Sequence, residues 1–285
     1  MKLLHPDACF FVPDGESSSK AFARCTLLGI GAHQDDLEFM SLHGIMAALD
    51  REDQWFGGIT CTDGVGSARQ GKYAGVTASQ MREIRRNEQN EAASLGQYSF
   101  MAQLGYSSEQ AKTRKLAGNM IDDLEQLISA SRPEVIYTHN LTDKHPTHIG
   151  VVMSVIEAVR RLPKEHRPSK MMGCEGWRNL DWLSDDEKLL LDVGGREAWV
   201  EKLNAVFASQ IEAGKRYDLA VEGRRRANAT FFDAHIVDQL EKATYAMDLT
   251  PLLQDDGLDP LVFATGSINR FREDVENKLN HYRLS

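Results

Sequence analysis

Short apolar runs alternate with longer amphipathic segments over the first part of the chain, and this alternation limits the possible folds more than any other feature. The strand-like runs cover residues 25–31, 55–61, 98–104, 134–139 and 170–174. Between them, apolar side chains recur with helical spacing at residues 36–52, 79–95, 118–131 and 148–162. Because helices of this kind connect parallel strands, the sequence predicts an α/β fold with a mostly parallel sheet and helices on both faces.

The pattern becomes less regular after residue 176. A strand-like run lies at 188–193, and a further one lies at 244–249. Helical segments lie at 196–213, 216–229 and 267–282. We expect a single domain over residues 1–285, with its core at about 25–175. The C-terminal elaboration, residues 176–285, is expected to extend this domain and to help cover its site.

The charge balance argues against two classes of partner. The chain has 33 Lys and Arg against 42 Asp and Glu, a net charge of −9 with neutral histidines. Such a chain repels phosphate backbones and anionic membrane surfaces, so we expect no nucleic-acid partner. The most basic cluster, Arg224, Arg225 and Arg226, is interpreted as a solvated helix face with Glu222 nearby.

Cysteine usage and hydropathy suggest a compartment. The four cysteines lie far apart without a CxxC pair, at positions 9, 25, 61 and 174. This pattern is typical of reduced thiols, so we expect a cytoplasmic protein. No export signal is evident, and no run reaches the roughly 18 apolar residues that span a bilayer, so membrane insertion is not expected.

Polar side chains gather just after two of the strand-like runs. His33, Asp35 and Asp36 follow the run at 25–31, and the segment Asp-Lys-His-Pro-Thr-His, residues 143–148, follows the run at 134–139. In open α/β sheets, ligands bind outside the carboxyl ends of the strands. The two clusters are therefore expected to converge on one ligand.

The residue types in these clusters suit a catalytic metal. Two imidazoles and one carboxylate leave a coordination position open for water, as in catalytic zinc sites. A second carboxylate can accept a proton from that water, and a further histidine can stabilise or protonate what forms. Composition alone leaves open whether Asp35 or Asp36 binds the metal. Either cluster taken singly could instead be a helix cap with surface charge.

These segments resemble a known family. GAHQDDLE at 31–38 is similar to the AHPDDE signature of the PIG-L/LmbE-like N-deacetylases, and DKHPTH at 143–148 is similar to their HPDH signature. Arg85 and Glu88, followed by Leu-Gly at 95–96, resemble the R-x-x-E helix of that family. A later stretch from residue 191 to residue 210 resembles its D-[IV]-T…K…SQ pattern, so the likeness covers roughly residues 25–235.

The resemblance implies a Rossmann-like fold and zinc-dependent hydrolysis of an N-acetyl group. The typical substrate is an N-acetylglucosamine-type amino sugar or its conjugate, and the products are acetate and a free amine. Carried over by position, His33, Asp36 and His148 hold Zn²⁺ or another divalent transition metal such as Fe²⁺. Asp35 is the implied general base. His145 is the implied residue that stabilises the oxyanion or protonates the amine.

Three positions depart from the family signatures. Gln34 replaces a proline, Leu37 replaces a glutamate, and Thr147 replaces the aspartate between the two histidines. A carboxylate at position 147 would favour a charged imidazole on the neighbouring histidine, whereas the threonine at this position offers only a hydroxyl. We therefore expect His145 to be protonated less readily, unless Asp143 supplies the carboxylate.

Substrate contacts are predicted at Arg69, in the glycine-rich loop after the second run, and at Asp143. Trp177 and Trp182 could form a sugar-stacking wall, with burial in the core as the alternative. Arg85 and Glu88 are expected to form a structural ion pair. Two other function classes remain open: a metal-dependent amidohydrolase acting on a non-sugar amide, and a non-catalytic carbohydrate-binding α/β domain.

Overall fold

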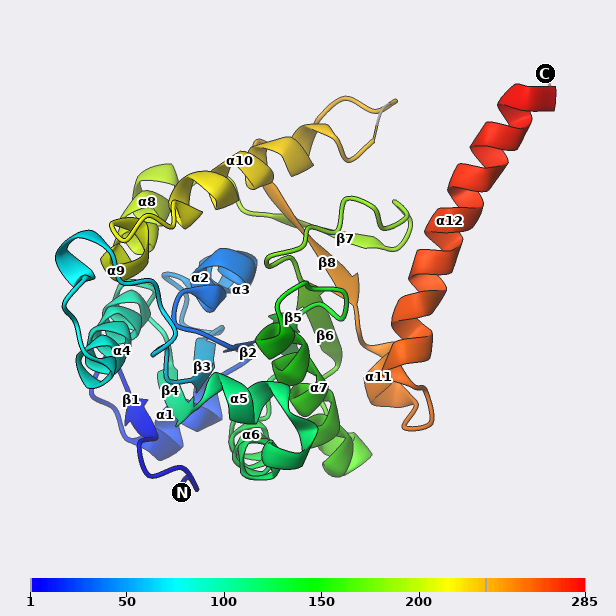
Figure 1. The fold of residues 1–285 in the computed structure, drawn as a ribbon. Helices are drawn as coiled ribbons and strands as arrows, with labels where there is room; N and C mark the ends of the chain where they lie inside the picture. The colour runs from blue at the N-terminus through cyan, green and yellow to red at the C-terminus, as the bar shows by residue number, and fades with distance from the viewer. Residues whose placement is uncertain (1, 234, 285) are drawn as a thin grey trace.

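The computed structural model describes residues 2–233 and 235–284, and these form one eight-stranded sheet flanked by helices (Figure 1). The strands are β1 (Cys9–Phe11), β2 (Leu27–Gly31), β3 (Phe56–Thr62), β4 (Phe100–Tyr106), β5 (Val135–His139), β6 (Lys170–Cys174), β7 (Lys188–Asp192) and β8 (Ala243–Asp248). Their order in the sheet is β1-β4-β3-β2-β5-β6-β8-β7. The predicted α/β class is therefore confirmed.

The sheet is mixed, so the prediction of a mostly parallel sheet was only partly right. The five central strands, β4, β3, β2, β5 and β6, pair in parallel. At the edges, β1 runs antiparallel to β4, and β8 runs antiparallel to both β6 and β7. The regular alternation of strand and crossover helix, which demands parallel pairing, ends at β6.

Helices cover both faces of the sheet, as predicted. They are α1 (Ser18–Arg24), α2 (Asp36–Met40), α3 (Leu42–Ala48), α4 (Ala78–Leu95), α5 (Ser108–Lys112), α6 (Gly118–Ser131), α7 (Pro146–Arg161), α8 (Glu197–Ala205), α9 (Ala208–Ile211), α10 (Tyr217–Thr230), α11 (Pro251–Gln254) and α12 (Pro260–Leu284). Short 3₁₀ turns occur at Gly71–Tyr73, Arg114–Leu116 and Lys164–His166.

Successive side chains of β2 show how the two core layers are divided, because side chains of a strand alternate between faces. Leu28 and Ile30 pack with α1, α6 and α7 in one cluster of buried residues. Leu27 belongs to a second cluster with Leu37 of α2 and Ile45 of α3. Burial on both faces explains why the central strands read as continuous apolar runs.

Several predicted boundaries differ from the observed ones. The predicted helix at 36–52 is two short helices, α2 and α3, which meet at Ser41. Helix α4 starts at Ala78, one residue earlier than predicted, because Thr77 and Gln80 form a reciprocal capping box at its start. Helix α12 begins at Pro260, earlier than predicted. Strand β1 and helices α1, α5 and α11 were not predicted.

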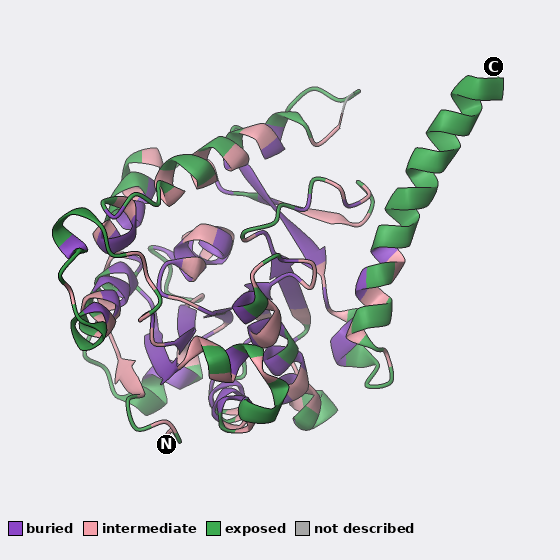
Figure 2. Cartoon of the chain, in the orientation of Figure 1, coloured by how far each residue is buried: buried purple, intermediate pink, exposed green. Residues whose placement is uncertain are grey.

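The C-terminal elaboration covers the site with only part of its length. Side chains in and just before α10 line the cavity described below: Lys215, Tyr217, Ala220, Val221, Arg224 and Arg225. Helix α12 instead projects away from the sheet, and it is exposed from Ile268 onward (Figure 2). No helix within residues 2–233 and 235–284 is both long enough and apolar enough to cross a membrane.

Candidate active site

The two polar clusters come together because β2 and β5 are neighbours in the sheet. These strands pair in parallel, so their carboxyl ends lie at the same edge. Strands β3 and β4 lie on one side of β2, whereas β5 and β6 lie on its other side. This reversal of the strand order creates a crevice at the carboxyl ends of β2 and β5. Gly31 ends β2, and a Cβ atom there would lie 2.9 Å from Cβ of Asp36. Glycine thus lets α2 begin directly against the strand.

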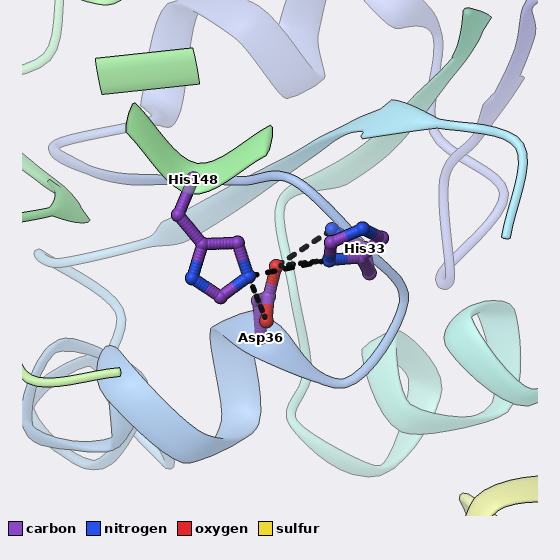
Figure 3. Close-up of side chains that lie close together, drawn as sticks. All are labelled: His33, Asp36 and His148. Atoms are coloured by element: carbon purple, nitrogen blue, oxygen red, sulfur yellow. Dashed lines mark hydrogen bonds and ion pairs between the residues drawn. The ribbon is translucent and has the colours of Figure 1, made fainter. Parts of the chain in front are cut away.

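His33, Asp36 and His148 form a group suited to a metal ion (Figure 3). His33 Nδ1 lies 3.3 Å from Asp36 Oδ2, and His148 Nε2 lies 3.6 Å from Asp36 Oδ1. The two ring nitrogens are 3.3 Å apart, and all three ligand atoms fall within 4.8 Å of one another. Lone pairs that converge this closely repel one another unless a proton or a cation lies between them, so the donor set fits a divalent cation.

A buried carboxylate orients His148. Asp143 Oδ2 lies 3.3 Å from Nδ1 of His148, on the side of the ring away from Asp36. This contact favours a hydrogen on Nδ1 and leaves the lone pair of Nε2 for the metal, as carboxylates behind metal-binding histidines do. Burial lowers the pKa of His148, but Asp36 and Asp143 outweigh that effect and raise it.

The predicted roles of Asp143 need correction. Its carboxylate accepts hydrogen bonds from the backbone N–H groups of His145 and Trp177, at 2.9 Å each. It therefore contacts the backbone of His145 and the ring of His148, and it is absent from the residues that line the cavity. Asp143 is buried beneath the site, and this placement does not fit a direct substrate contact.

Asp143→Asn is expected to weaken metal binding about 10- to 100-fold, because an amide cannot replace the carboxylate behind His148. Competition with a chromophoric chelator measures the dissociation constant for Zn²⁺. Asp122→Asn is a suitable control, since Asp122 pairs with Arg161 on the surface. An unchanged Zn²⁺ affinity in a folded Asp143→Asn variant would show that Asp143 does not support the metal ligand.

His139 was not predicted to take part in the site. It is the last residue of β5, and its Nε2 accepts a hydrogen bond of 2.9 Å from the backbone N–H of Ala32. The same nitrogen lies 3.3 Å from Asp36 Oδ2, and the ring stacks on His148 with centroids 3.8 Å apart. Burial, then the neighbouring His148, lowers the pKa of His139 to about 4. The sequence showed only a histidine at the end of an apolar run, which does not by itself indicate a site residue.

Asp36 is held in its charged form. Burial by itself would raise the pKa of this carboxyl, but the imidazoles of His148 and His139 hold the pKa well below its usual range. Its Oδ2 also accepts a hydrogen bond of 2.6 Å from the backbone N–H of His33. The carboxylate is therefore ready to bind a cation.

Asp35 points to a different partner, although it is the adjacent residue. Its backbone has a φ of 101°, in the left-handed region that non-glycine residues rarely occupy. The carboxylate lies 3.1 Å from Nη2 of the buried Arg85, and it lines the cavity. Burial raises the pKa of Asp35 to about 6, against the lowering effect of Arg85. Such backbone strain is concentrated at functional sites.

Arg85 does more than the predicted structural pairing. Its ion pair with Glu88 is present, at 3.4 Å, but the guanidinium also contacts Asp35 and the backbone carbonyl of Gln34. Glu88 in turn accepts hydrogen bonds from the backbone N–H and the hydroxyl of Ser209, at 2.7 and 2.6 Å. This network ties α4 and α9 to Asp35.

His145 caps the start of α7 and lines the cavity. Its Nδ1 accepts a hydrogen bond of 3.3 Å from the backbone N–H of Thr147, so the neutral ring carries its hydrogen on Nε2. Burial, with the neighbouring His148 and His33, lowers the pKa of His145 to about 4. Thr147 thus acts through its backbone, and a neutral imidazole is available as a hydrogen-bond donor.

The other two signature departures lie in the protein interior. Leu37 packs in the core, and Gln34 donates hydrogen bonds to the Thr62 carbonyl and to Gln103, at 3.0 and 3.2 Å. Glu38 accepts hydrogen bonds from Tyr98 and Gln89 on the sheet side of α2, at 2.7 and 2.8 Å. It therefore does not take the place of the missing signature glutamate at the metal group.

A cavity of about 650 Å³ opens over the metal group. Asp35, His145, Trp177 and Tyr217 line it, and the rings of Trp177 and Tyr217 meet at a centroid distance of 5.8 Å. Of the two tryptophans considered as a stacking wall, Trp182 packs instead against Phe271 of α12, at 6.2 Å.

Arg69 is not placed as predicted. It is exposed, it donates a hydrogen bond of 2.9 Å to the carbonyl of Val65, and it does not line the cavity. Other residues of its loop do reach the cavity wall: Gly64, Gly66, Ser67 and Ala68. The loop curls so that its arginine side chain returns to its own backbone.

Comparison with known protein families gives a match. Residues 28–159 match the family model described as PIG-L, GlcNAc-PI de-N-acetylase. We refer to residues 28–159, which are similar to this family, as the PIG-L segment. The PIG-L segment contains both polar clusters, and thus the metal group, Asp35 and His145. No curated protein matches the chain.

Solved structures share the fold. The N,N'-diacetylchitobiose deacetylase from Pyrococcus horikoshii is 16% identical, with a TM-score of 0.62 over 85% of this chain and 90% of that one. GalB, the 4-carboxy-2-hydroxymuconate hydratase from Pseudomonas putida KT2440, is 15% identical, with a TM-score of 0.61 over 79% and 96%. A deacetylase in the biosynthesis pathway of teicoplanin is 14% identical, with a TM-score of 0.59 over 78% and 97%. At these identities the likeness shows a common architecture.

Proposed function

We propose that this protein is a zinc-dependent N-deacetylase of an amino-sugar conjugate, which hydrolyses the acetamide to acetate and a free amine. One observation carries the proposal: the metal group opens onto a cavity that also presents Asp35 and a neutral His145. The PIG-L match supports this assignment. The shared fold with two proteins named as deacetylases agrees with it.

Two histidine nitrogens and one carboxylate suit Zn²⁺, and other divalent transition metals such as Fe²⁺ accept the same donors. Bound by His33, Asp36 and His148, the cation would act as a Lewis acid toward the acetamide carbonyl and lower the pKa of a water. Asp143 and His139 keep the ligands oriented, through the contacts already described.

Asp35 is the group that accepts the proton of the attacking water. Its carboxylate lies at the cavity wall, and Arg85 holds it there. The guanidinium also stabilises the charged carboxylate, which must be deprotonated to act as a base. As oxygen bonds to the acetamide carbon, one proton passes to a carboxylate oxygen of Asp35.

His145 is placed to stabilise the negative charge that develops on the carbonyl oxygen. Its Nε2 carries the hydrogen in the neutral ring, so it can donate to an oxyanion. The carbon–nitrogen bond then breaks, and the proton held by Asp35 passes to the departing nitrogen. These steps give acetic acid and a neutral amine, and transfer of the acid proton to the amine gives acetate and ammonium, so that all atoms and protons are accounted for.

Acetate release tests the proposal. The zinc-loaded protein is incubated with N-acetylglucosamine, N,N'-diacetylchitobiose and phosphorylated or lipid-linked N-acetylglucosamine, and acetate and primary amine are measured together. We expect equal amounts of both from at least one substrate, loss of activity after chelation, and recovery with Zn²⁺. A protein that binds zinc but releases acetate from no amino sugar would favour the amidohydrolase or binding-domain alternatives.

A further inference from the structure

Three cations from the segment that follows the PIG-L match line the cavity: Lys215, Arg224 and Arg225. Two other cavity cations have carboxylate partners, because Arg85 contacts Asp35 at 3.1 Å and Lys112 contacts Glu109 at 2.8 Å. Within residues 2–233 and 235–284, these three cations form no ion pair. No described carboxylate therefore neutralises their charge within ion-pair distance.

The carboxylates near these cations pair with other side chains. Glu212 pairs with Lys72, and Asp218 pairs with Arg216. Glu222 pairs with Arg226 at 2.7 Å and with Lys242 at 2.9 Å. Each neighbouring acid is thus neutralised by a cation that does not line the cavity. In a chain of net charge −9, this distribution leaves positive charge where a ligand would bind.

Arg225 is the most buried of the three, and the earlier interpretation of Arg224–Arg226 as a solvated helix face is wrong for it. Its side chain is 2% exposed, and Nη2 donates to the carbonyls of Glu38 and Phe39 at 3.0 and 3.1 Å. Nε and Nη1 have no hydrogen-bond acceptor. A buried guanidinium without an anion is costly. Arg225 secures the end of α2 and adds positive potential behind the cavity wall.

Arg224 and Lys215 gather around Trp177. Arg224 Nη1 donates a hydrogen bond to the carbonyl of Gly176, the residue before this tryptophan. Lys215 Nζ lies 5.6 Å from the centre of the Trp177 ring, and Lys144 Nζ lies 5.9 Å from it on the exposed rim. The ring of His145 is 6.0 Å from the Trp177 ring, so these cations flank the reacting end of the cavity.

Three carboxylates line the cavity, and each is held by other groups of the protein. Asp35 and Asp36 belong to the metal end. The remaining carboxylate of the cavity lining is Glu175, and both its oxygens are engaged, by the backbone N–H of Leu180 at 2.8 Å and by Asn228 at 2.7 Å. On this wall Arg224 and Lys215 outnumber the one carboxylate, Glu175, so the local charge balance favours an anion.

We propose that Arg224 and Lys215, beside Trp177, form a subsite for an anionic group on the N-acetylated substrate. The substrate class is then an acidic amino-sugar conjugate, with a carboxylate or a phosphate, which guanidinium binds in a bidentate manner. This inference rests on the proposed deacetylase function. It assigns a specificity role to the C-terminal elaboration, which lies outside the PIG-L segment.

Three substrates that share the acetamide test the subsite: neutral N-acetylglucosamine, N-acetylglucosamine 1-phosphate and N-acetylmuramic acid, which carries a carboxylate. With the zinc-loaded full chain, we expect KM to be at least about tenfold lower for one anionic substrate than for the neutral sugar. The phosphate and carboxylate arms show which anion the subsite accepts. Equal KM values for all three would overturn the proposal.

Arg224→Gln and Lys215→Gln are expected to reduce this preference for the anion about tenfold each, through KM rather than kcat. Arg226→Gln is the matched control: it is the next residue on α10, it is exposed, and it pairs with Glu222. This control should keep the wild-type preference. If Arg224→Gln raises KM equally for neutral and anionic sugars, the subsite does not exist.

Calorimetric binding separates this inference from the proposed function, because it needs no turnover. Anionic sugars that bind more tightly than N-acetylglucosamine, with this difference lost in Arg224→Gln and kept in Arg226→Gln, support the subsite even if no acetate is released. Any affinity of the anion for zinc itself is common to both variants and cancels. Acetate release from all sugars with no difference in affinity would support the deacetylase and refute the subsite.

Discussion

Asp35→Asn lowers kcat for acetate release by about 10²- to 10⁴-fold, the usual contribution of a general base, while Zn²⁺ remains bound. The amide cannot accept the proton of the attacking water. The metal group does not include Asp35, so its ligands stay in place. Asparagine tolerates the left-handed backbone that this position requires, at a φ of 101°, and the local fold is therefore retained. Steady-state kinetics and zinc content of the same preparation provide the measurement.

Asp50→Asn is a matched control for this prediction. Asp50 also has a left-handed backbone, with a φ of 61°, but it is exposed and pairs with Arg196 far from the metal group. The control should turn over at the wild-type rate. If zinc-loaded Asp35→Asn also retained near-wild-type kcat, the proton would have to go elsewhere, and the assignment of Asp35 as base would be withdrawn.

His148→Ala removes both bound metal and activity. His148 is fully buried and contributes one of three ligand atoms, and the remaining pair leaves too few donors for a stable tetrahedral site. Zinc content after dialysis is expected to fall from one ion per chain to near zero, with acetate release reduced to background. Metal analysis and the acetate assay measure the two effects.

His33→Ala provides a second variant with less risk to the fold, since His33 is only half-buried. It should lose metal in the same way, with a thermal melt that confirms folding. His281→Ala, on the exposed part of α12, is the control that should retain both zinc and turnover. Retention of one tightly bound zinc in folded His33→Ala and His148→Ala would contradict this ligand set.

The sequence determined the fold class and the location of the chemistry. Strand and helix periods are local properties, and the apolar runs before His33 and before Asp143 were sufficient to place both polar clusters at strand ends. Parallel pairing of β2 with β5 then brings the clusters together. The signatures that indicated the PIG-L family lie in the same two segments.

Tertiary structure decided which of two adjacent carboxylates meets which partner. The left-handed backbone at Asp35 directs its side chain to Arg85, whereas Asp36 turns to His33 and His148. Composition and periodicity do not distinguish two aspartates in succession, and before the structure only the resemblance to the family signature implied an assignment. The role of His139 was also hidden, because a histidine that ends an apolar strand gives no sign of which residues will pack on it.

The same limit applies to the cations of α10 and to the sheet edges. Arg225 and Arg226 are consecutive, yet one is buried against the end of α2 and the other is exposed, since each residue turns about 100° around a helix. The antiparallel entry of β8 between β6 and β7 likewise depends on contacts between distant segments. Periodicity and composition therefore located the reaction centre, whereas the partners of its individual side chains, and the charge of the wall that faces the substrate, arose only from long-range packing.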